Sequence, residues 1–287
     1  MKRFILITLG LFAVAFDLRA QVTAEIVMSQ EYFLMGEAIP VAVRIANRSG
    51  QKLTLGEDAD WLQVSVEARS GFVVAKNSEP DVQGVFTIES GQVATRKIDI
   101  APHFSFEKNG RYQVAATVKL KAWETTVSAK AKTFDIINGA RVWSQDFGMP
   151  TASGENTTPE VRRYSLEQAN HLRNQLKLYL RVTDASGSRI IKVTPVGQVV
   201  AISKPQCEID RASNLHVLYQ NGARSYLYTV LNPDGEMILR QTHEIADARP
   251  KLRGNDNGMF TVHGGLRLPS ENDIPSPKPI EADVSAK

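Results

Sequence analysis

The fold is decided by residues 31–55, EYFLMGEAIPVAVRIANRSGQKLTL, in which an alternating run lies between two turns. Ile39, Val41, Val43 and Ile45 share one side of the run, and Pro, Ala and Arg residues fall between them. A period of two predicts a β-strand that buries one face. The segments MGE and NRSG at the two ends are typical of turns. This stretch therefore predicts a strand of an antiparallel sheet, and it indicates no chemistry.

The same alternation recurs along the next hundred residues. The longest one-face row comprises Tyr112, Val114, Ala116, Val118 and Leu120. Further strands are expected over 24–28, 62–68, 72–74, 85–88, 94–100, 127–131 and 134–136. Short strands separated by turns, with no helical pattern among them, predict an antiparallel β-sandwich over residues 21–140.

Two motifs of this region resemble bacterial immunoglobulin-like domains of exported proteins. They are FLMGEAIPVAVRIANRSG (33–50) and KNGRYQVAATV (108–118). The resemblance implies that Tyr112 stands at a corner before a late strand, where its hydroxyl bonds back to the upstream backbone. The chain departs from the pattern in two ways: Lys108 stands where an acid is common, and the inter-sheet cysteines are missing. The resemblance implies a fold, and a fold alone does not imply a function.

Residues 161–268 are predicted to form a second, turn-rich β domain. The run of Gly, Pro, Ser, Thr and Asn over 147–160 is typical of a linker, which we place over 141–160. After it, alternating segments are separated by the turns DASGS, NGA, NPDG and NDNG. Residues 165–175, SLEQANHLRNQ, fit either a short helix capped by Ser165 or an irregular loop.

A weak repeat runs through this second region. Pro159, Pro205 and Pro250 are 46 and 45 residues apart, and each precedes a turn or loop and a strand. Such a period resembles the blades of β-propellers. About two and a half units are present, whereas closure needs about four. The sequence therefore predicts either a few blade-like sheets packed on one another or a second sandwich, and an all-β fold in both cases. The Pro- and Ser-rich residues 269–287 are predicted to be a disordered tail.

Residues 1–20 have the pattern of a signal peptide. The basic MKR precedes a 13-residue apolar run, FILITLGLFAVAF, and the segment ends at a small residue, Ala20. The run is shorter than the roughly 20 residues that span a bilayer, although an uncleaved anchor is the alternative. We therefore expect an exported protein, periplasmic or extracellular, that touches a membrane only through this segment if it is not cleaved. The single cysteine, Cys207, cannot form an internal disulfide and is expected to be a buried apolar filler.

The charge of the chain does not indicate nucleic-acid binding. Residues 1–20 hold three basic side chains and one acidic one, so the formal net charge of +3 falls to +1 for residues 21–287. Nucleic-acid binding would need a concentrated basic patch. We therefore expect no nucleic-acid partner.

No catalytic or metal-binding motif is found. The sequence has no GxSxG elbow, phosphate loop, GxGxxG or HExxH, and its five histidines are scattered. The acidic turns EDAD (57–60) and NDN (255–257) lack the spacing of a calcium loop. We therefore predict no enzyme, no catalytic residue, no metal and no cofactor.

The candidate binding residues are Arg224, Tyr226 and Tyr228 in GARSYLY, because two tyrosines on one strand face beside an arginine could contact a partner. Burial in a sheet would explain the tyrosines equally well. The predicted function is a non-enzymatic exported binding protein of the cell envelope or extracellular space, with another protein as partner. The alternatives are a carbohydrate-binding module and an accessory subunit of an exported enzyme. For the latter the candidate residues are Asp184, Asp210, Arg224 and Asp234.

Overall fold

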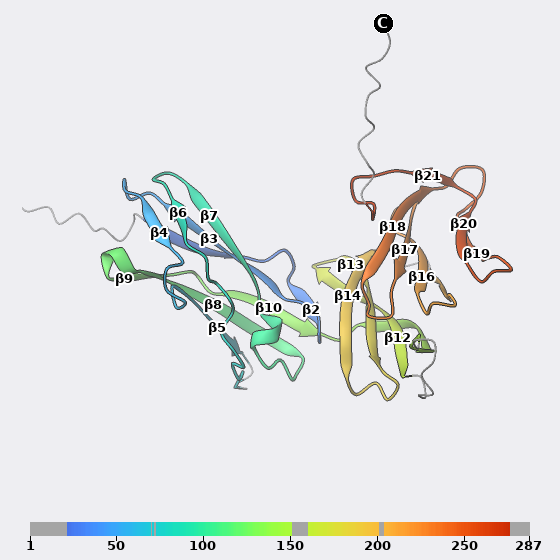
Figure 1. Cartoon of the computed structure of the whole chain (residues 1–287), viewed down its shortest axis with the longest axis horizontal. Coiled ribbons are helices and arrows are strands. Elements are labelled where there is room, and N and C mark those ends of the chain that lie inside the picture. Colours follow the sequence, from blue (N-terminus) through green and yellow to red (C-terminus); the bar gives the residue numbers. More distant parts are fainter. Residues whose placement is uncertain (1–21, 70, 72, 151–159, 201–203, 276–287) are drawn as a thin grey trace, which may run out of the picture.

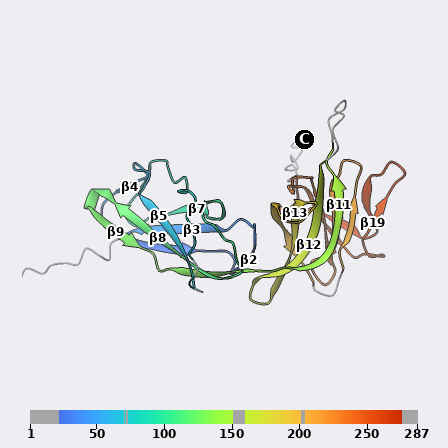
Figure 2. The same ribbon diagram turned by 90° about the horizontal axis from the view of Figure 1, so that it is seen from below.

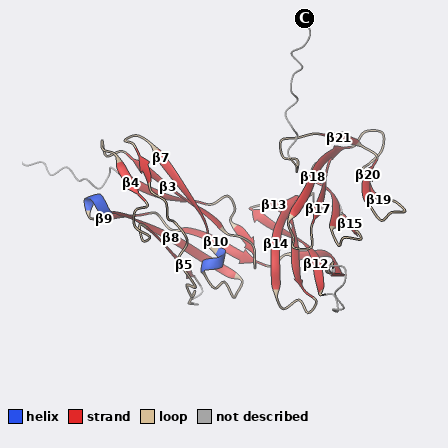
Figure 3. Ribbon diagram, in the orientation of Figure 1, coloured by secondary structure: helices blue, strands red, loops and turns tan. Residues whose placement is uncertain are grey.

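The computed structural model describes residues 22–69, 71, 73–150, 160–200 and 204–275. Within these residues the chain is all-β and has no α-helix; the only helical elements are the short 3₁₀ turns η2 (Ala101–His103) and η3 (Lys121–Trp123) (Figure 3). Figures 1 and 2 show two groups of sheets lying end to end, which we call the N-terminal lobe and the C-terminal lobe. The predicted signal segment, 1–20, lies outside the described residues.

The N-terminal lobe is built from three sheets. Its strands are β1 (Val22–Val27), β2 (Tyr32–Leu34), β3 (Pro40–Asn47), β4 (Leu53–Leu55), β5 (Leu62–Ala68), β6 (Phe86–Ile88), β7 (Val93–Asp99), β8 (Gly110–Leu120), β9 (Thr125–Ser128) and β10 (Lys132–Ile137). One sheet has the order β1-β3-β7, the second the order β2-β10-β8-β5 with β9 also on β8, and the third is the pair β4-β6. All pairs are antiparallel except β10 with β2.

Alternation predicted the buried faces of this lobe correctly. Val41, Val43 and Ile45 of β3 are buried, and so is every member of the row that begins at Tyr112 in β8. These side chains meet in one continuous core between the sheets. The Tyr112 hydroxyl donates a hydrogen bond to the carbonyl of Lys108, which confirms the predicted bond back to the upstream backbone.

The C-terminal lobe consists of two up-and-down meanders and a hairpin. Its strands are β11 (Ala140–Gly148), β12 (Val161–Leu172), β13 (Gln175–Asp184), β14 (Ile190–Gln198), β15 (Gln206–Ile209), β16 (Leu215–Gln220), β17 (Ser225–Leu231), β18 (Met237–Glu244), β19 (Lys251–Gly254), β20 (Phe260–His263) and β21 (Leu266–Leu268). The sheets are β11-β12-β13-β14, β15-β16-β17-β18-β21 and β19-β20. The two larger sheets share a core that includes Tyr164, Leu180 and Tyr219, and the described residues form no closed propeller.

Several segments differ from the expectations drawn from the sequence. The strand expected over 72–74 is wrong, because Val73 and Val74 belong to no strand, while residue 72 lies outside the described residues. The linker expected over 141–160 is wrong for 141–148, because these residues belong to β11 and pair with β12; residues 151–159 are not described. The short helix considered for 165–175 is also wrong, since the segment completes β12 and starts β13. The tail expected over 269–287 is ordered as far as 275: Asp273 is buried, and Ile274 pairs with Arg240. Residues 276–287 are not described.

The turn after β2, in the N-terminal lobe, packs against the C-terminal lobe. Leu34 packs with Tyr179 and Val193 of the β11–β14 sheet in a small cluster of its own. Gly36 lies so close to Ile190 that an added Cβ would be 2.9 Å from a methyl group, and its φ of +85° also favours glycine. This close packing explains why Tyr179 of β13 is buried as well as Leu178 and Leu180, which lie on the opposite face of the strand.

Buried polar groups complete this contact between the lobes. Glu37, which is 2% exposed, accepts hydrogen bonds from Gln30 Nε2 and the Leu34 amide. Burial raises the pKa of the Glu37 carboxyl above its usual range, against the opposing effect of these two bonds. Arg181 of β13 donates to the Met35 carbonyl (2.9 Å) and forms two hydrogen bonds with Glu167. The contact is therefore specified by polar pairing as well as by apolar packing.

Candidate functional site: the free edge of β5

The three residues predicted to bind a partner do not form one surface. Tyr226 and Tyr228 are only 7% and 6% exposed, and they face a small core beneath the β19–β20 hairpin. Arg224 is largely exposed and donates to the Ile245 carbonyl (2.6 Å). Packing within the lobe therefore accounts for both tyrosines.

Tyr228 takes part in a buried polar chain. Its hydroxyl lies 2.7 Å from His216 Nδ1, and His216 Nε2 lies 3.1 Å from the Asp210 carboxylate. The same hydroxyl lies 3.3 Å from the Phe260 carbonyl of β20, and the Phe260 ring packs on His216. These hydrogen bonds thus attach the β19–β20 hairpin to the β15–β18 sheet. Burial raises the pKa of the Tyr228 hydroxyl to about 12.

The carboxylates considered for an enzyme site belong to separate turns. Asp184 accepts hydrogen bonds from Ser186, Ser188 and the Arg189 amide. Asp210 binds His216 and Asn214, and Asp234 pairs with Arg162 across the two meanders. Each of these carboxylates has a local structural role that explains its position.

No group of three or more His, Cys, Asp or Glu side chains that could hold a metal occurs among the described residues. Asp58 and Asp60 of the EDAD turn pair instead with Lys121 and Lys119. The Cys207 side chain packs against the core of the C-terminal lobe, and burial raises the pKa of its thiol to about 12. Such a thiol stays protonated at neutral pH.

The candidate site that the sequence did not predict is β5, the last strand of its sheet. Hydrogen bonds from Lys119 N to Trp61 O and from Arg69 N to Arg111 O show that odd-numbered residues direct their backbone groups toward β8. In an antiparallel strand the directions alternate. The amides of Leu62, Val64 and Val66 therefore point away from β8, and within the described residues no hydrogen bond uses them.

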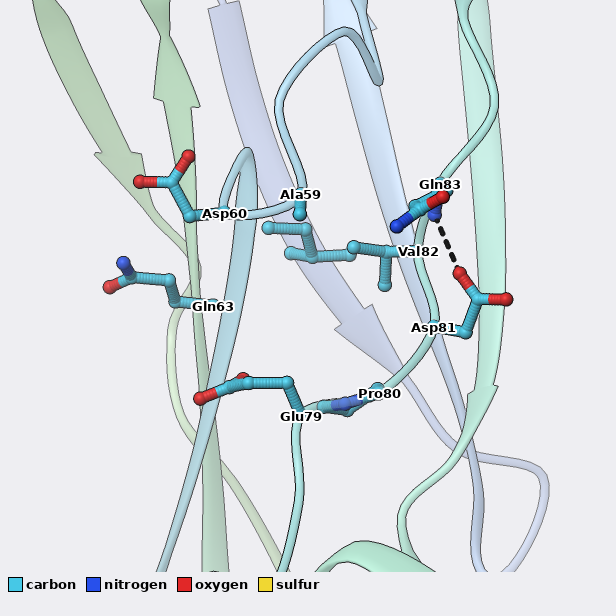
Figure 4. A pocket seen from close by; sticks show the side chains of 9 residues that line it. Ala59, Asp60, Gln63, Glu79, Pro80, Asp81, Val82 and Gln83 are labelled. Atoms are coloured by element: carbon cyan, nitrogen blue, oxygen red, sulfur yellow. Dashed lines mark hydrogen bonds between the residues drawn. The ribbon is translucent and has the colours of Figure 1, made fainter.

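Two solvent-open hollows flank this free edge, between β5 and the segment 74–83. The first, which we call the Asp60 hollow, has a volume of about 370 Å³ and is lined by Asp60, Leu62, Gln63, Glu79, Pro80 and Val82, with Ala59, Asp81 and Gln83 beside them (Figure 4). The second, the Phe104 hollow, has a volume of about 430 Å³ and is lined by Val64, Val66, Val74, Lys76 and Phe104 with Gln63, Ser65, Glu79 and Thr117. Because Gln63 and Glu79 line both, the two hollows adjoin along the strand.

One ion pair, between Lys76 and Glu79, lies where the two hollows adjoin. Lys76 Nζ lies 2.6 Å from Glu79 and 3.2 Å from the Val64 carbonyl, which is one of the outward-pointing backbone groups. Lysine at a sheet edge is a common way to discourage unwanted pairing. Glu79 is 71% exposed, so this pair is weak and can be displaced.

The wall of the Asp60 hollow is held by a buried tryptophan. Trp61 Nε1 donates to the Val82 carbonyl (2.8 Å), and its ring packs edge-on against Phe86. Trp61 therefore fixes the segment 74–83 at a set distance from β5. The end strand of the opposite sheet, β7, is flanked by a smaller hollow of about 280 Å³, and there Arg96 donates to the Gln83 carbonyl.

Comparison with known proteins adds no assignment. No protein-family model, no curated protein and no solved structure matches the chain. None of the helical turns in the described part of the chain is long and apolar enough to cross a membrane.

Proposed function

We propose that the chain is a non-enzymatic, exported binding protein that takes up an extended segment of another protein along the free edge of β5. The observation that carries the proposal is the row of unused amides at Leu62, Val64 and Val66 beside two adjoining hollows. An extended segment that joins a sheet edge gains main-chain hydrogen bonds, and pockets along the edge select its alternate side chains. The pattern of residues 1–20 supports the placement outside the cytoplasm.

We further propose a specific fold for each of the two lobes. The N-terminal lobe is an immunoglobulin-like sandwich, supported by its two facing sheets and by the bond from Tyr112 to the Lys108 carbonyl. The C-terminal lobe is a partial set of propeller-like blades, supported by a four-stranded and a five-stranded sheet that share a core, and by a hairpin. The sandwich then binds the partner at β5, and the C-terminal lobe packs against the turn after β2, the strand at the other edge of the same sheet.

The two alternative functions, a carbohydrate-binding module and an accessory subunit of an exported enzyme, are supported by no feature comparable to the free edge of β5. A carbohydrate module would present aromatic rings at its surface, but Tyr226, Tyr228 and Trp61 are buried, and Trp123 and Trp143 are half-buried and pack against the cores of the two lobes. The carboxylates suggested for an enzyme subunit serve separate turns, as described above. Binding of a protein segment is therefore the function that the described residues support best.

The proposal is tested with peptides that bind the chain, selected from a phage-displayed library of random 12-residue peptides. Substitution Val66→Pro removes an outward amide and leaves the β8 pairing intact, because proline is tolerated at a sheet edge where its nitrogen faces solvent. We expect Val66→Pro to weaken peptide binding at least tenfold, as measured by fluorescence anisotropy.

The matched control is Val66→Ala, which shortens the same buried side chain and keeps the amide. Its peptide affinity should remain within about threefold of the unsubstituted protein. Equal affinities of the two variants, or a library that yields no binding peptide, would refute strand addition at β5.

A further inference from the structure

We infer that the segment taken up at β5 carries a long basic side chain, lysine or arginine, which lies in the Asp60 hollow. This inference rests on the proposed function and adds the chemistry of the partner. It follows from the shape of the hollow, from the charges around it and from its place on the free edge.

The hollow suits a side chain that is apolar along its length and charged at its end. Figure 4 shows Val82 and Ala59 at the centre of the hollow, with the side chains of Asp60, Gln63 and Glu79 around its margin. Lysine and arginine bury their methylene stems on apolar surface and keep the charged group at the rim. A purely apolar side chain would make no favourable contact with the margin carboxylates, whereas a basic one would add a second cation beside them.

The charges on the lining residues are all negative. Asp60, Glu79 and Asp81 line the hollow, and no lysine, arginine or histidine does. The Asp81 carboxylate accepts a hydrogen bond from the Gln83 amide (Figure 4), whereas Asp60 and Glu79 are paired only with lysines outside the lining, so these two are the groups available to a ligand. An acidic segment would be repelled by this lining, which makes a basic one the matching partner.

The existing partners of the two carboxylates do not close the hollow. Lys119 lies 2.9 Å from Asp60, and Lys76 lies 2.6 Å from Glu79, but neither lysine lines the hollow. Lys119 holds the pKa of the Asp60 carboxyl below its usual range, so Asp60 is ionised at neutral pH. Pairs as exposed as these contribute little and can share or exchange a cation.

Strand geometry places the basic side chain next to the backbone pairing. Leu62 lines the Asp60 hollow and also offers one of the outward amides, whereas Val64 and Val66 line the Phe104 hollow. A segment paired along β5 therefore passes both hollows, and residues two apart point to the same side of it. One basic position near Leu62 and a second selective position near Val66 are expected in one peptide.

The experiment uses the full chain and the peptides selected above. We expect lysine or arginine to recur at one position of the selected peptides. Replacing that residue by methionine, which keeps an apolar stem, should weaken binding to the unsubstituted protein about tenfold at low salt and less at high salt. The same peptide change should alter binding less than twofold in the double variant Asp60→Asn/Glu79→Gln.

The matched control is Asp58→Asn, which removes a neighbouring acid that pairs with Lys121 and does not line the hollow. This variant should respond to the methionine peptide as the unsubstituted protein does. Peptides that bind at β5 without a preferred basic residue would overturn this inference and leave the proposed function standing. A tenfold loss that persists in Asp60→Asn/Glu79→Gln would also overturn it, and the absence of any binding peptide would overturn both.

Discussion

Alanine in place of Trp61 is expected to lower the free energy of unfolding by about 3–5 kcal/mol. The indole is buried in the core of the N-terminal lobe, packs against Phe86 and holds the Val82 carbonyl through Nε1. Its removal leaves a large cavity and an unpaired carbonyl. Because Val82 belongs to the wall of the Asp60 hollow, peptide binding at β5 should be lost together with stability.

Urea unfolding followed by far-UV circular dichroism measures this effect without relying on the fluorescence of the deleted residue. The control is Trp61→Phe, which keeps an aromatic ring in the core and removes the indole N–H together with part of the ring volume. Its loss should be about 1–3 kcal/mol, smaller than that of alanine. A loss below about 1 kcal/mol for Trp61→Ala would mean that the indole does not organise this core.

The second large effect is expected at the contact between the lobes, where Glu167→Ala should cost about 3–5 kcal/mol. Glu167 and Arg181 form two hydrogen bonds of 2.9 and 3.2 Å, and their side chains are only 11% and 15% exposed. Removing the carboxylate leaves the guanidinium of Arg181 buried without its counter-charge. Arg181 also donates to the Met35 carbonyl, so the change should weaken the contact between the lobes.

A double substitution distinguishes the effect of losing the ion pair from the effect of leaving one buried charge unpaired. The variant Glu167→Leu/Arg181→Met replaces both ions by apolar side chains of similar length. It should be clearly more stable than Glu167→Ala in the same urea titration, because no buried charge remains unpaired. A double variant as unstable as the single one would show that the bond from Arg181 to Met35, and not the ion pair, holds the contact.

Local alternation predicted the individual strands well. The buried rows of β3 and β8 follow directly from residues 39–45 and 112–120, since side chains of a strand alternate between two faces whatever its neighbours are. The bond of Tyr112 was also predictable, because it spans only four residues. The strand β12 was missed because SLEQANHL has neither clean alternation nor β-branched residues. Its place in the sheet comes from pairing with β11 and β13.

The candidate site could not be predicted in the same way. Whether β5 ends a sheet depends on strand order, which is set by contacts between distant parts of the chain. Asp60 and Glu79 are separated in sequence by a strand and by an irregular segment, and both line the hollow whose wall Trp61 holds through the Val82 carbonyl. The one local signal was the segment 75–84, AKNSEPDVQG, which is too irregular for a strand and lies between two predicted ones. Glu37 was hidden for a similar reason: MGE is typical of an exposed turn, yet this turn is covered by the other lobe.

Amide hydrogen exchange, followed by NMR with and without a selected peptide, tests strand addition at β5 most directly. We expect the amides of Leu62, Val64 and Val66 to gain protection when the peptide binds. Those of Gln63, Ser65 and Glu67, which already pair with β8, should keep the protection they have. Fast exchange at all three even-numbered positions in the saturated complex, with new protection elsewhere on the molecule, would contradict binding at the free edge of β5.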